Sequence, residues 1–346
     1  MGQVLIILTM RYFYCLLLVL GVFQQFPVFA QTAPDASALI KEAVQLNKEG
    51  KYTDAVDKYT EALKLDPDNV YANYGVAFSL LASGKGDDGI PYLEKVIKTN
   101  NAVTAWAYDL LGSIYDKDKN SAKAIAAFNE GIKVDPKYQR LYYNLGLVYF
   151  RDKNYSEAEK CAVQSLKIDP KHASSQRMYA LVCFHQNKRA NALLGLCSFI
   201  LLEPSTARSA EAYGNIQHIL QGGDVKAQPG APPLVADAST VALNLAMPKA
   251  LTEAGKKKYN SAGDLLAAQL TAIFTAIGPL ADTQNGDIFF RTYYAAYFYK
   301  LAQSANMPAF ARLVSQSTPE STEWVKNNAK AMTALDDWVK VTERSF

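Results

Sequence analysis

The residue types that carry most enzyme chemistry are few and scattered in this chain. The three histidines, His172, His185 and His218, lie far apart, and no His/Cys/Asp cluster has the spacing of a metal site. The sequence contains no glycine-rich phosphate loop and no glycine–serine nucleophile elbow. Residues 256–258 form a short basic run that we assign to a solvated helix end. We therefore predict that the protein is not an enzyme and uses no metal or cofactor.

Binding is the chemistry that the composition favours. The chain has 21 tyrosines, and tyrosine is enriched both in cores and at binding surfaces. The 36 Lys and Arg residues are balanced by 33 Asp and Glu, which gives a formal charge of +3 over 346 residues. This balance argues against nucleic acid or an anionic membrane as the partner.

Residues 1–30 differ from the rest of the chain. They contain one basic residue, Arg11, no acidic residue, and an apolar run over residues 12–23. Val28 and Ala30 stand at the −3 and −1 positions of a signal-peptidase site, so we predict a signal peptide cleaved after Ala30. The alternative is a retained signal anchor, for which the apolar run is short. No further membrane span is predicted, and we expect an exported protein, either secreted or in the periplasm of a Gram-negative bacterium.

Three cysteines remain after cleavage: Cys161, Cys183 and Cys197. All three fall at near-core positions of predicted helices. We expect them to be buried free thiols, the alternative being a bridge between Cys161 and Cys183.

A repeat of helical hairpins dominates the middle of the chain. Small residues recur at intervals of 34, 35, 34 and 34 residues in the second helix of each hairpin: Ala55, Gly89, Ala124, Ala158 and Ala192. Each is preceded by another small residue twelve positions earlier: Ala43, Ala77, Gly112, Gly146 and Ala180. Twelve positions after each stands a proline, or Asn101 in the second repeat. Small residues allow close helix contact, and apolar residues at helical spacing lie between them. Because one hairpin cannot bury its apolar faces alone, the copies must stack.

This pattern resembles the tetratricopeptide repeat family, over residues 36–206. The segments LLGSIY (residues 110–115), YNLGLVY (residues 143–149) and KYTDAVDKYTEALKLDP (residues 51–67) carry the resemblance. It implies an all-α, right-handed solenoid of five helix pairs. Repeat two departs from the pattern at Gly89 and Pro91, so its second helix should start late. The second helix of repeat five is unusually apolar, and we expect something to cover it.

The resemblance also implies a concave groove lined by the first helix of each repeat, which would bind a protein or peptide partner. The groove-facing positions carried over by register are Tyr71, Tyr74, Phe78 and Leu81 in repeat two, Trp106, Asp109 and Ser113 in repeat three, Arg140, Tyr143, Leu147 and Phe150 in repeat four, and Arg177, Leu181, Phe184 and His185 in repeat five. Alternatively, several of these side chains pack only against neighbouring repeats. The chaperone-tail binders of the family hold a carboxylate with a lysine and an asparagine. Ile40 and Val44 occupy those positions here, so an apolar or aromatic peptide suits this groove better.

The domain organisation predicted from the sequence has four parts. A signal peptide (1–30) precedes a solenoid with a capping helix at residues 207–221 (31–222 in all). A Pro/Gly-rich linker (223–239) and a helical C-terminal domain of no recognised family (240–346) follow. Within the last part we expect a short extended segment at residues 241–247 and helices at residues 261–277, 286–305, 308–316 and 319–344. The aromatic run at residues 287–300 is expected to be mainly core, with its surplus tyrosines packed on the repeats.

Three hypotheses for function stay open. The preferred one is a non-catalytic adaptor or assembly scaffold that binds a partner through the groove. In the second, the C-terminal domain or the linker at residues 225–235 fills the groove of a structural protein. In the third, an enzyme site lies in the C-terminal domain, around Asp287 or Arg291.

Overall fold

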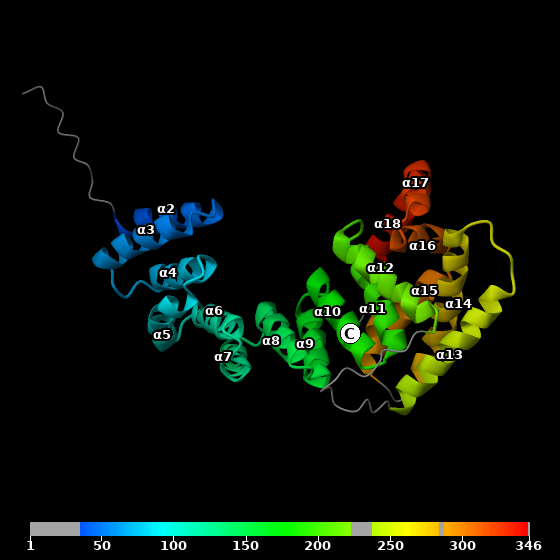
Figure 1. Ribbon diagram of the computed structural model, residues 1–346, viewed down its shortest axis with the longest axis horizontal. Helices are drawn as coiled ribbons and strands as arrows, with labels where there is room; N and C mark the ends of the chain where they lie inside the picture. Colours follow the sequence, from blue (N-terminus) through cyan, green and yellow to red (C-terminus); the bar gives the residue numbers. More distant parts are fainter. Residues whose placement is uncertain (1–34, 223–236, 284–286, 345–346) are drawn as a thin grey trace, which may run out of the picture.

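The described part of the chain is helical throughout. The structure is a computed structural model, and it describes residues 35–222, 237–283 and 287–344. The predicted signal peptide and most of the predicted linker therefore lie outside the described residues. Within the described residues there is no strand, which confirms the all-α prediction. The repeats form an arc that begins at α2 and ends at α11, where the C-terminal helices gather into a lobe (Figure 1).

Five helix pairs make up the arc. They are α2 (Ala36–Lys48) with α3 (Tyr52–Leu65), α4 (Val70–Ala82) with α5 (Ile90–Lys98), α6 (Thr104–Lys117) with α7 (Ser121–Val134), α8 (Gln139–Arg151) with α9 (Tyr155–Ile168), and α10 (Ala173–His185) with α11 (Arg189–Leu202). In repeat two the short 3₁₀ turn η1 (Gly86–Gly89) precedes α5, which carries Pro91 in its first turn. The predicted late start of this helix is confirmed.

The same backbone turn joins the two helices of every pair. One residue in each turn has a positive φ between 55° and 89°, at Gly50, Gly84, Lys119, Lys153 and Asn187. These five positions repeat with the period of the small residues, because the chain reverses at the same point in each repeat. Only the first two are glycine. In the later repeats a residue with a side chain adopts the left-handed backbone conformation, which costs some strain.

The recurring small residues lie where helices touch. A Cβ on Gly112 would come within 2.6 Å of the Phe128 ring, and a Cβ on Gly146 would come within 2.8 Å of Met178. The first four repeats bury separate apolar clusters at successive junctions, for example around Ala55 and Tyr59, around Leu93 and Leu110, and around Phe128 and Leu145.

The capping helix α12 (Ala207–Leu220) continues the repeat pattern by one helix. Gly214 stands 34 residues after Ala180, and Gly222 has a φ of 79° where a sixth turn would fall. A Cβ on Gly214 would meet no described atom within 4 Å. The helix is therefore the first half of a sixth repeat, and no described second helix packs at Gly214.

Seven helical segments follow in the C-terminal lobe. They are α13 (Ala238–Gly255), α14 (Ala262–Thr283), the π-helical turn η2 (Phe290–Ala295), α15 (Ala296–Ala302), α16 (Met307–Val314), α17 (Pro319–Asn327) and α18 (Ala329–Val341).

The expected extended segment at residues 241–247 is wrong, because these residues lie within α13. Asp237 caps this helix by accepting a hydrogen bond from the Thr240 backbone N–H at 2.7 Å. Leu243 and Met247 are buried at helical spacing. Pro248 lies inside the helix, where it costs one backbone hydrogen bond that tertiary packing must offset.

The single helix expected at residues 319–344 is also wrong, since α17 and α18 are separated at Asn328. This residue has φ −125° and ψ 43°, and its side-chain amide donates to the Trp324 carbonyl oxygen at 2.8 Å. The predicted start of α17 is confirmed, with Thr318 as its cap and Pro319 in its first turn.

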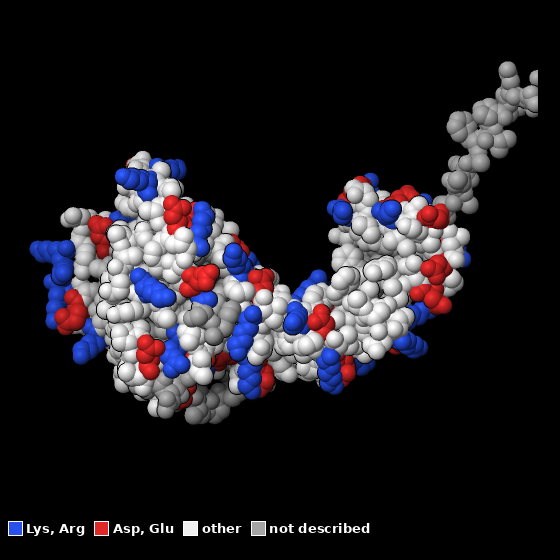
Figure 2. Space-filling model, turned by 180° about the vertical axis from the view of Figure 1, so that it is seen from behind, with Lys and Arg blue, Asp and Glu red and all other residues white. Residues whose placement is uncertain are grey.

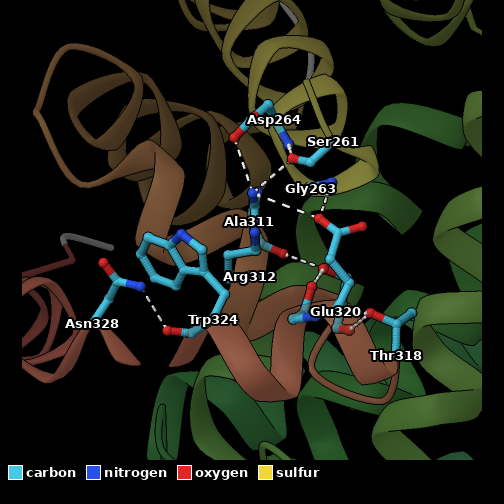
Figure 3. Close-up of polar contacts among 11 residues, drawn as sticks. Ser261, Gly263, Asp264, Ala311, Arg312, Thr318, Glu320, Trp324 and Asn328 are labelled. Carbon is cyan, nitrogen blue, oxygen red and sulfur yellow. Dashed lines mark hydrogen bonds and ion pairs between the residues drawn. The ribbon is translucent and has the colours of Figure 1, made fainter. Parts of the chain in front are cut away.

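A buried arginine ties the beginning of α14 to α16 and α17 (Figure 3). The Arg312 guanidinium donates to Asp264 and to Ser261, each at 2.9 Å, and lies 3.7 Å from Glu320. It also stands over the Trp324 ring, and a Cβ on Gly263 would come within 2.0 Å of it. Only glycine therefore fits at position 263 in this packing.

Helix α14 is the central helix of the lobe. By length and hydropathy alone it is the one helix of the described residues that could cross a membrane, a test that core helices of other proteins also pass. It packs against α13, α15, α16 and η2, and Leu270, Ile273 and Ile277 on it have no exposed surface. We describe it as a core helix. The absence of a membrane span after the signal stays a prediction.

The apolar helix of repeat five is covered, as its sequence predicts. All ten residues 191–200 of α11 are buried, and α11 contacts α13, α16 and η2. One continuous apolar core runs from Tyr155 and Leu166 of repeat four through α11 to Phe274, Phe310 and Leu335 of the lobe. Repeat five and the C-terminal helices thus share a core.

The three cysteines are buried free thiols, as expected. Burial raises the pKa of Cys161 to about 12 and that of Cys183 well above its usual value. The thiols are therefore protonated at neutral pH, and a bridge between Cys161 and Cys183 is absent.

Candidate functional site

The predicted groove lies on one face of the first helices. Three of its side chains are clearly exposed: Tyr71 at 58%, Trp106 at 40% and Leu147 at 38%. Arg140 is exposed as well, whereas Tyr74, Phe78, Leu81, Ser113, Tyr143, Phe150, Arg177, Leu181, Phe184 and His185 are half-buried. The surface is hollowed between the N-terminal repeats and the C-terminal lobe, and charges of both signs are interspersed on the face shown in Figure 2.

Asp109 is the one predicted groove residue that is buried. Its side chain is 1% exposed, with its carboxylate 3.0 Å from Arg140 and accepting a hydrogen bond from Asn144 at 2.7 Å. Burial raises the Asp109 pKa, and the nearby Arg140 guanidinium opposes that shift. Asp109 therefore fixes the position of Arg140, a neighbour from the next repeat.

Aromatic rings touch across the junctions between repeats. The rings of Tyr74 and Trp106 meet edge to face with centroids 6.2 Å apart, and those of Phe150 and His185 do so at 5.3 Å. Burial raises the Tyr74 pKa to about 12, so its hydroxyl stays protonated. The predicted alternative, packing between repeats, thus holds for part of these side chains, whereas Tyr71, Trp106 and Leu147 stay exposed.

The end of the groove nearest α12 contains a small hollow. Its volume is about 100 Å³, and its lining combines apolar with basic side chains: Tyr143, Leu147, Phe150, Ser174, Arg177, Met178, Leu181 and Arg208. Arg177 forms an ion pair with Glu211 at 2.7 Å, and Arg208 pairs with Glu203. Sequence reasoning missed Arg208 and Glu211, although the 34-residue register places them at the groove positions of α12.

The histidines have structural roles in this region. The His172 ring lies within hydrogen-bond distance of Gln139 and Ser175, and the His185 ring stacks on Tyr155 at 5.0 Å. Burial lowers the pKa of both imidazoles, so they are neutral at pH 7. Within residues 35–222, 237–283 and 287–344, no cluster of His, Cys, Asp or Glu could hold a metal ion.

The C-terminal lobe contacts repeat five on a different face. The amide of Gln176 donates to the Tyr293 hydroxyl at 2.6 Å and accepts from the Tyr294 hydroxyl at 2.5 Å, while Tyr179 stacks on Tyr294 at 4.9 Å. With 3.6 residues per turn, Gln176 and Tyr179 point roughly opposite to Arg177 and Leu181 on α10. The lobe therefore covers the back of the repeat and adds no residue to the lining of the hollow. The linker at residues 225–235 lies outside the described residues.

The chain is an α-solenoid of helical hairpins, extended by a helical lobe. The hairpins are tetratricopeptide repeats: sequence profiles described as "Tetratricopeptide repeat" and "TPR repeat" match residues 140–172, and residues 45–84 and 112–153, respectively. The predicted family is thus confirmed.

Known proteins similar to this chain share the repeats. A 94-residue stretch, 27% of the chain, is 36% identical to "Hsp70-Hsp90 organizing protein 3" of Arabidopsis thaliana and spans 16% of that relative. Among solved structures, MamA is 24% identical, with 46% of this chain and 94% of MamA covered at a TM-score of 0.42. The pilF protein of Pseudomonas aeruginosa is 18% identical, with 54% and 89% covered at a TM-score of 0.47.

Proposed function

We propose that this protein is a non-catalytic, exported scaffold that binds an extended segment of a partner protein in the groove of its repeats. The observation that carries the proposal is the hollow formed by Tyr143, Leu147 and Phe150 beside Arg177 and Arg208. Aromatic and arginine side chains dominate the energetics of protein–protein interfaces, and an apolar hollow accepts an anchoring side chain.

The side chains along the groove favour an apolar or aromatic segment. Tyr71, Trp106 and Leu147 expose apolar surface at successive repeats and are not covered by the lobe. An extended peptide offers side chains on alternate sides, so one row can face these three residues. Tetratricopeptide repeat proteins are typically non-catalytic, which supports the same assignment. The relative in Arabidopsis is by its name an organiser of two chaperones, yet Ile40 and Val44 stand at the clamp positions of repeat one here. We therefore favour an apolar partner segment over a chaperone tail.

A selection with random peptides tests the groove. Peptides are first captured by the purified wild-type protein. Their affinities for two triple variants are then compared with their affinity for the wild type. The groove variant carries Tyr71→Ala, Trp106→Ala and Leu147→Ala. A control variant carries Leu65→Ala, Val134→Ala and Leu245→Ala, which remove equally exposed apolar side chains from outside the predicted groove positions. We expect the groove variant to lose at least about tenfold in affinity and the control to lose little.

Two results would contradict the groove proposal. One is a set of captured peptides that bind the groove variant as well as the wild type. The other is an equal loss in both triple variants, which would indicate non-specific apolar adhesion. Circular dichroism of both variants establishes beforehand that they are folded.

The export proposal is supported by the composition of residues 1–30 and has a separate test. The intact mass of the protein isolated from a secreting bacterial host should correspond to a chain that begins at Gln31. Ala30→Asp should leave the precursor uncleaved, because the peptidase requires a small residue at −1. A precursor that keeps residues 1–30 in the wild type would favour the signal-anchor alternative.

A further inference from the structure

A second cavity lies on the face of repeat five that is turned away from the groove. Its volume is about 600 Å³, within the range typical of small-molecule sites. It opens where the ends of α11 and α18 meet η2 and α15. Its walls mix apolar with basic side chains: Pro170, Leu201, Leu202, Tyr293, Tyr297, Val339, Lys171, Lys340 and Arg344.

This cavity exists because repeat five departs from the other repeats at two positions. The places equivalent to Ser198 and Leu201 hold polar or charged residues elsewhere: Glu61 and Lys64, Lys95 and Lys98, Glu130 and Lys133, Gln164 and Lys167. In those repeats the side chains face solvent, and all of these lysines are exposed. Repeat five instead has Ser198, whose hydroxyl is buried, and Leu201, and both residues line the cavity.

Arg344 supplies a cation inside this cavity. One of its terminal nitrogens donates to the Ser198 hydroxyl at 2.6 Å, and its guanidinium carbon lies 4.0 Å from the centre of the Tyr297 ring and 4.9 Å from that of Tyr293. Among the described residues no carboxylate forms an ion pair with it. A guanidinium has five N–H donors. The bonds to Ser198 and to the hydroxyls of Tyr293 and Tyr297 still leave donors for a ligand. The aromatic rings hold the group in place without neutralising its charge.

The remaining charges keep the cavity basic. Lys340 is already paired with Asp336, Lys171 forms no ion pair with a described carboxylate, and Glu343 is the one acidic residue in the lining. Buried Gln176 is fully engaged by Tyr293, Tyr294 and Pro170, so it does not compete for a ligand. An unneutralised guanidinium beside an apolar wall is suited to a carboxylate carried on an apolar chain.

We propose that this cavity binds an apolar monocarboxylate, with the carboxylate on Arg344 and the chain against Leu201, Leu202 and Val339. The site is separate from the peptide groove and does not depend on it. A ligand there would contact α11, η2 and α18 together, and would therefore stabilise the junction between repeat five and the lobe.

Calorimetric titration of the purified protein tests the proposal with matched probes. Octanoate carries the charge and the chain, and octanamide carries the chain alone. Acetyl-Ala-Leu-Leu, as free acid and as amide, distinguishes a peptide C-terminus from a fatty acid as the source of the carboxylate. We expect octanoate or the peptide acid to bind at least about tenfold more tightly than its amide, because only the acid forms a charge-assisted hydrogen bond.

Three variants locate the binding site. Arg344→Gln should weaken acid binding about tenfold or more and leave amide binding unchanged. Leu202→Trp, at a position 39% exposed and so tolerant of a larger side chain, should fill the cavity and weaken both probes. Arg177→Gln in the groove is the control and should change neither.

Several outcomes would overturn the proposal. They are equal affinity for acid and amide, no binding of any probe up to about 10 mM, or a loss that follows Arg177→Gln in place of Arg344→Gln. The thermal midpoint of each variant, measured without ligand, separates loss of the site from loss of the fold.

Discussion

The second helices of repeats four and five occupy equivalent places in the solenoid, 34 residues apart, but face different surroundings. On α9, Lys160, Gln164 and Lys167 are exposed to solvent. Their equivalents on α11 are Leu194, Ser198 and Leu201, of which the first two are buried. These three positions, among others that differ, show how a solvent-facing helix surface has become one that packs against another lobe. The repeat geometry fixes where a helix lies, and the outward positions decide what it touches.

Exchanging residues between these two helices should have the largest effect on the stability of the protein. Leu194→Lys gives repeat five the residue that repeat four carries at that place, and it buries an unpaired ammonium group. We expect a loss of at least about 3 kcal/mol in the stability of the C-terminal half. Hydrogen exchange should accelerate in α11 and α13–α16 and stay unchanged in α2–α7. The reverse exchange, Lys160→Leu, should alter stability by less than about 0.5 kcal/mol. Uniformly faster exchange along the whole chain would contradict the comparison.

Two glycines distinguish the packed lobe from the open end of the repeats. Gly263→Ala places a methyl group against the Arg312 guanidinium and should destabilise the lobe by about 1–3 kcal/mol. Gly214→Ala on α12 meets no described neighbour and should stabilise its helix by up to about 1 kcal/mol. Urea unfolding followed through tryptophan fluorescence measures both, since Trp324 and Trp338 lie in the lobe. Equal effects of the two substitutions would mean that Gly214 is packed as tightly as Gly263.

The polar contact between repeat five and the lobe should have an effect on stability of similar size to that of Gly263→Ala. Gln176→Leu removes the partner of the buried Tyr294 hydroxyl, and we expect a loss of about 1–3 kcal/mol in the free energy of unfolding. Asn73 holds the equivalent position in repeat two and donates to backbone carbonyls within its own repeat. Asn73→Leu should therefore destabilise the N-terminal repeats alone. A Gln176→Leu variant that leaves hydrogen exchange in η2 unchanged would contradict this account of the junction.

A pH dependence in the groove should be the smallest of these effects. The Asp109 pKa is raised in the folded protein by burial, so the folded state holds this proton more tightly than the unfolded state does. Protonated Asp109 therefore contributes favourably to stability at a pH below the ordinary aspartate pKa. This contribution is lost as the pH rises through the Asp109 pKa of the folded protein. Relative to wild type, Asp109→Asn should gain stability as the pH rises above the ordinary aspartate pKa. Parallel stability curves over this range would show that Arg140 fully compensates for the burial.

The sequence predicted the repeats well because each of their features is local and occurs several times. The small residues, the turn positions and the apolar character of α11 all follow from spacing within one hairpin. The lobe was harder to predict, since its boundaries depend on contacts between distant segments. Weak alternation over residues 241–247 favoured an extended segment. The helix forms there because Asp237 caps it, and its Asn244 side chain bonds the Asn187 carbonyl and the Arg189 N–H of repeat five.

The aromatic run at residues 287–300 was also hard to predict, because its contacts are with distant segments of the chain. At ideal α-helical spacing Tyr293 and Tyr294 would point in different directions, with only Tyr294 on the core face. The π turn of η2 changes this register, and both hydroxyls reach Gln176. The expected packing of surplus tyrosines on the repeats is confirmed for Tyr293. Tyr299 instead lies against Gly278 of α14. Gln176, the partner of Tyr293, lies 117 residues away in the chain, so no local sequence pattern could identify it.

The separate apolar clusters of the first repeats have a consequence for how such a chain can change. Each junction between repeats one and four is closed by residues of adjacent hairpins, whereas the core beyond repeat four is shared by many distant segments. Whole units of about 34 residues can therefore be gained or lost near the N-terminal end without disturbing the lobe. The length of the groove is then free to vary in descendants of this chain, while its C-terminal end stays fixed.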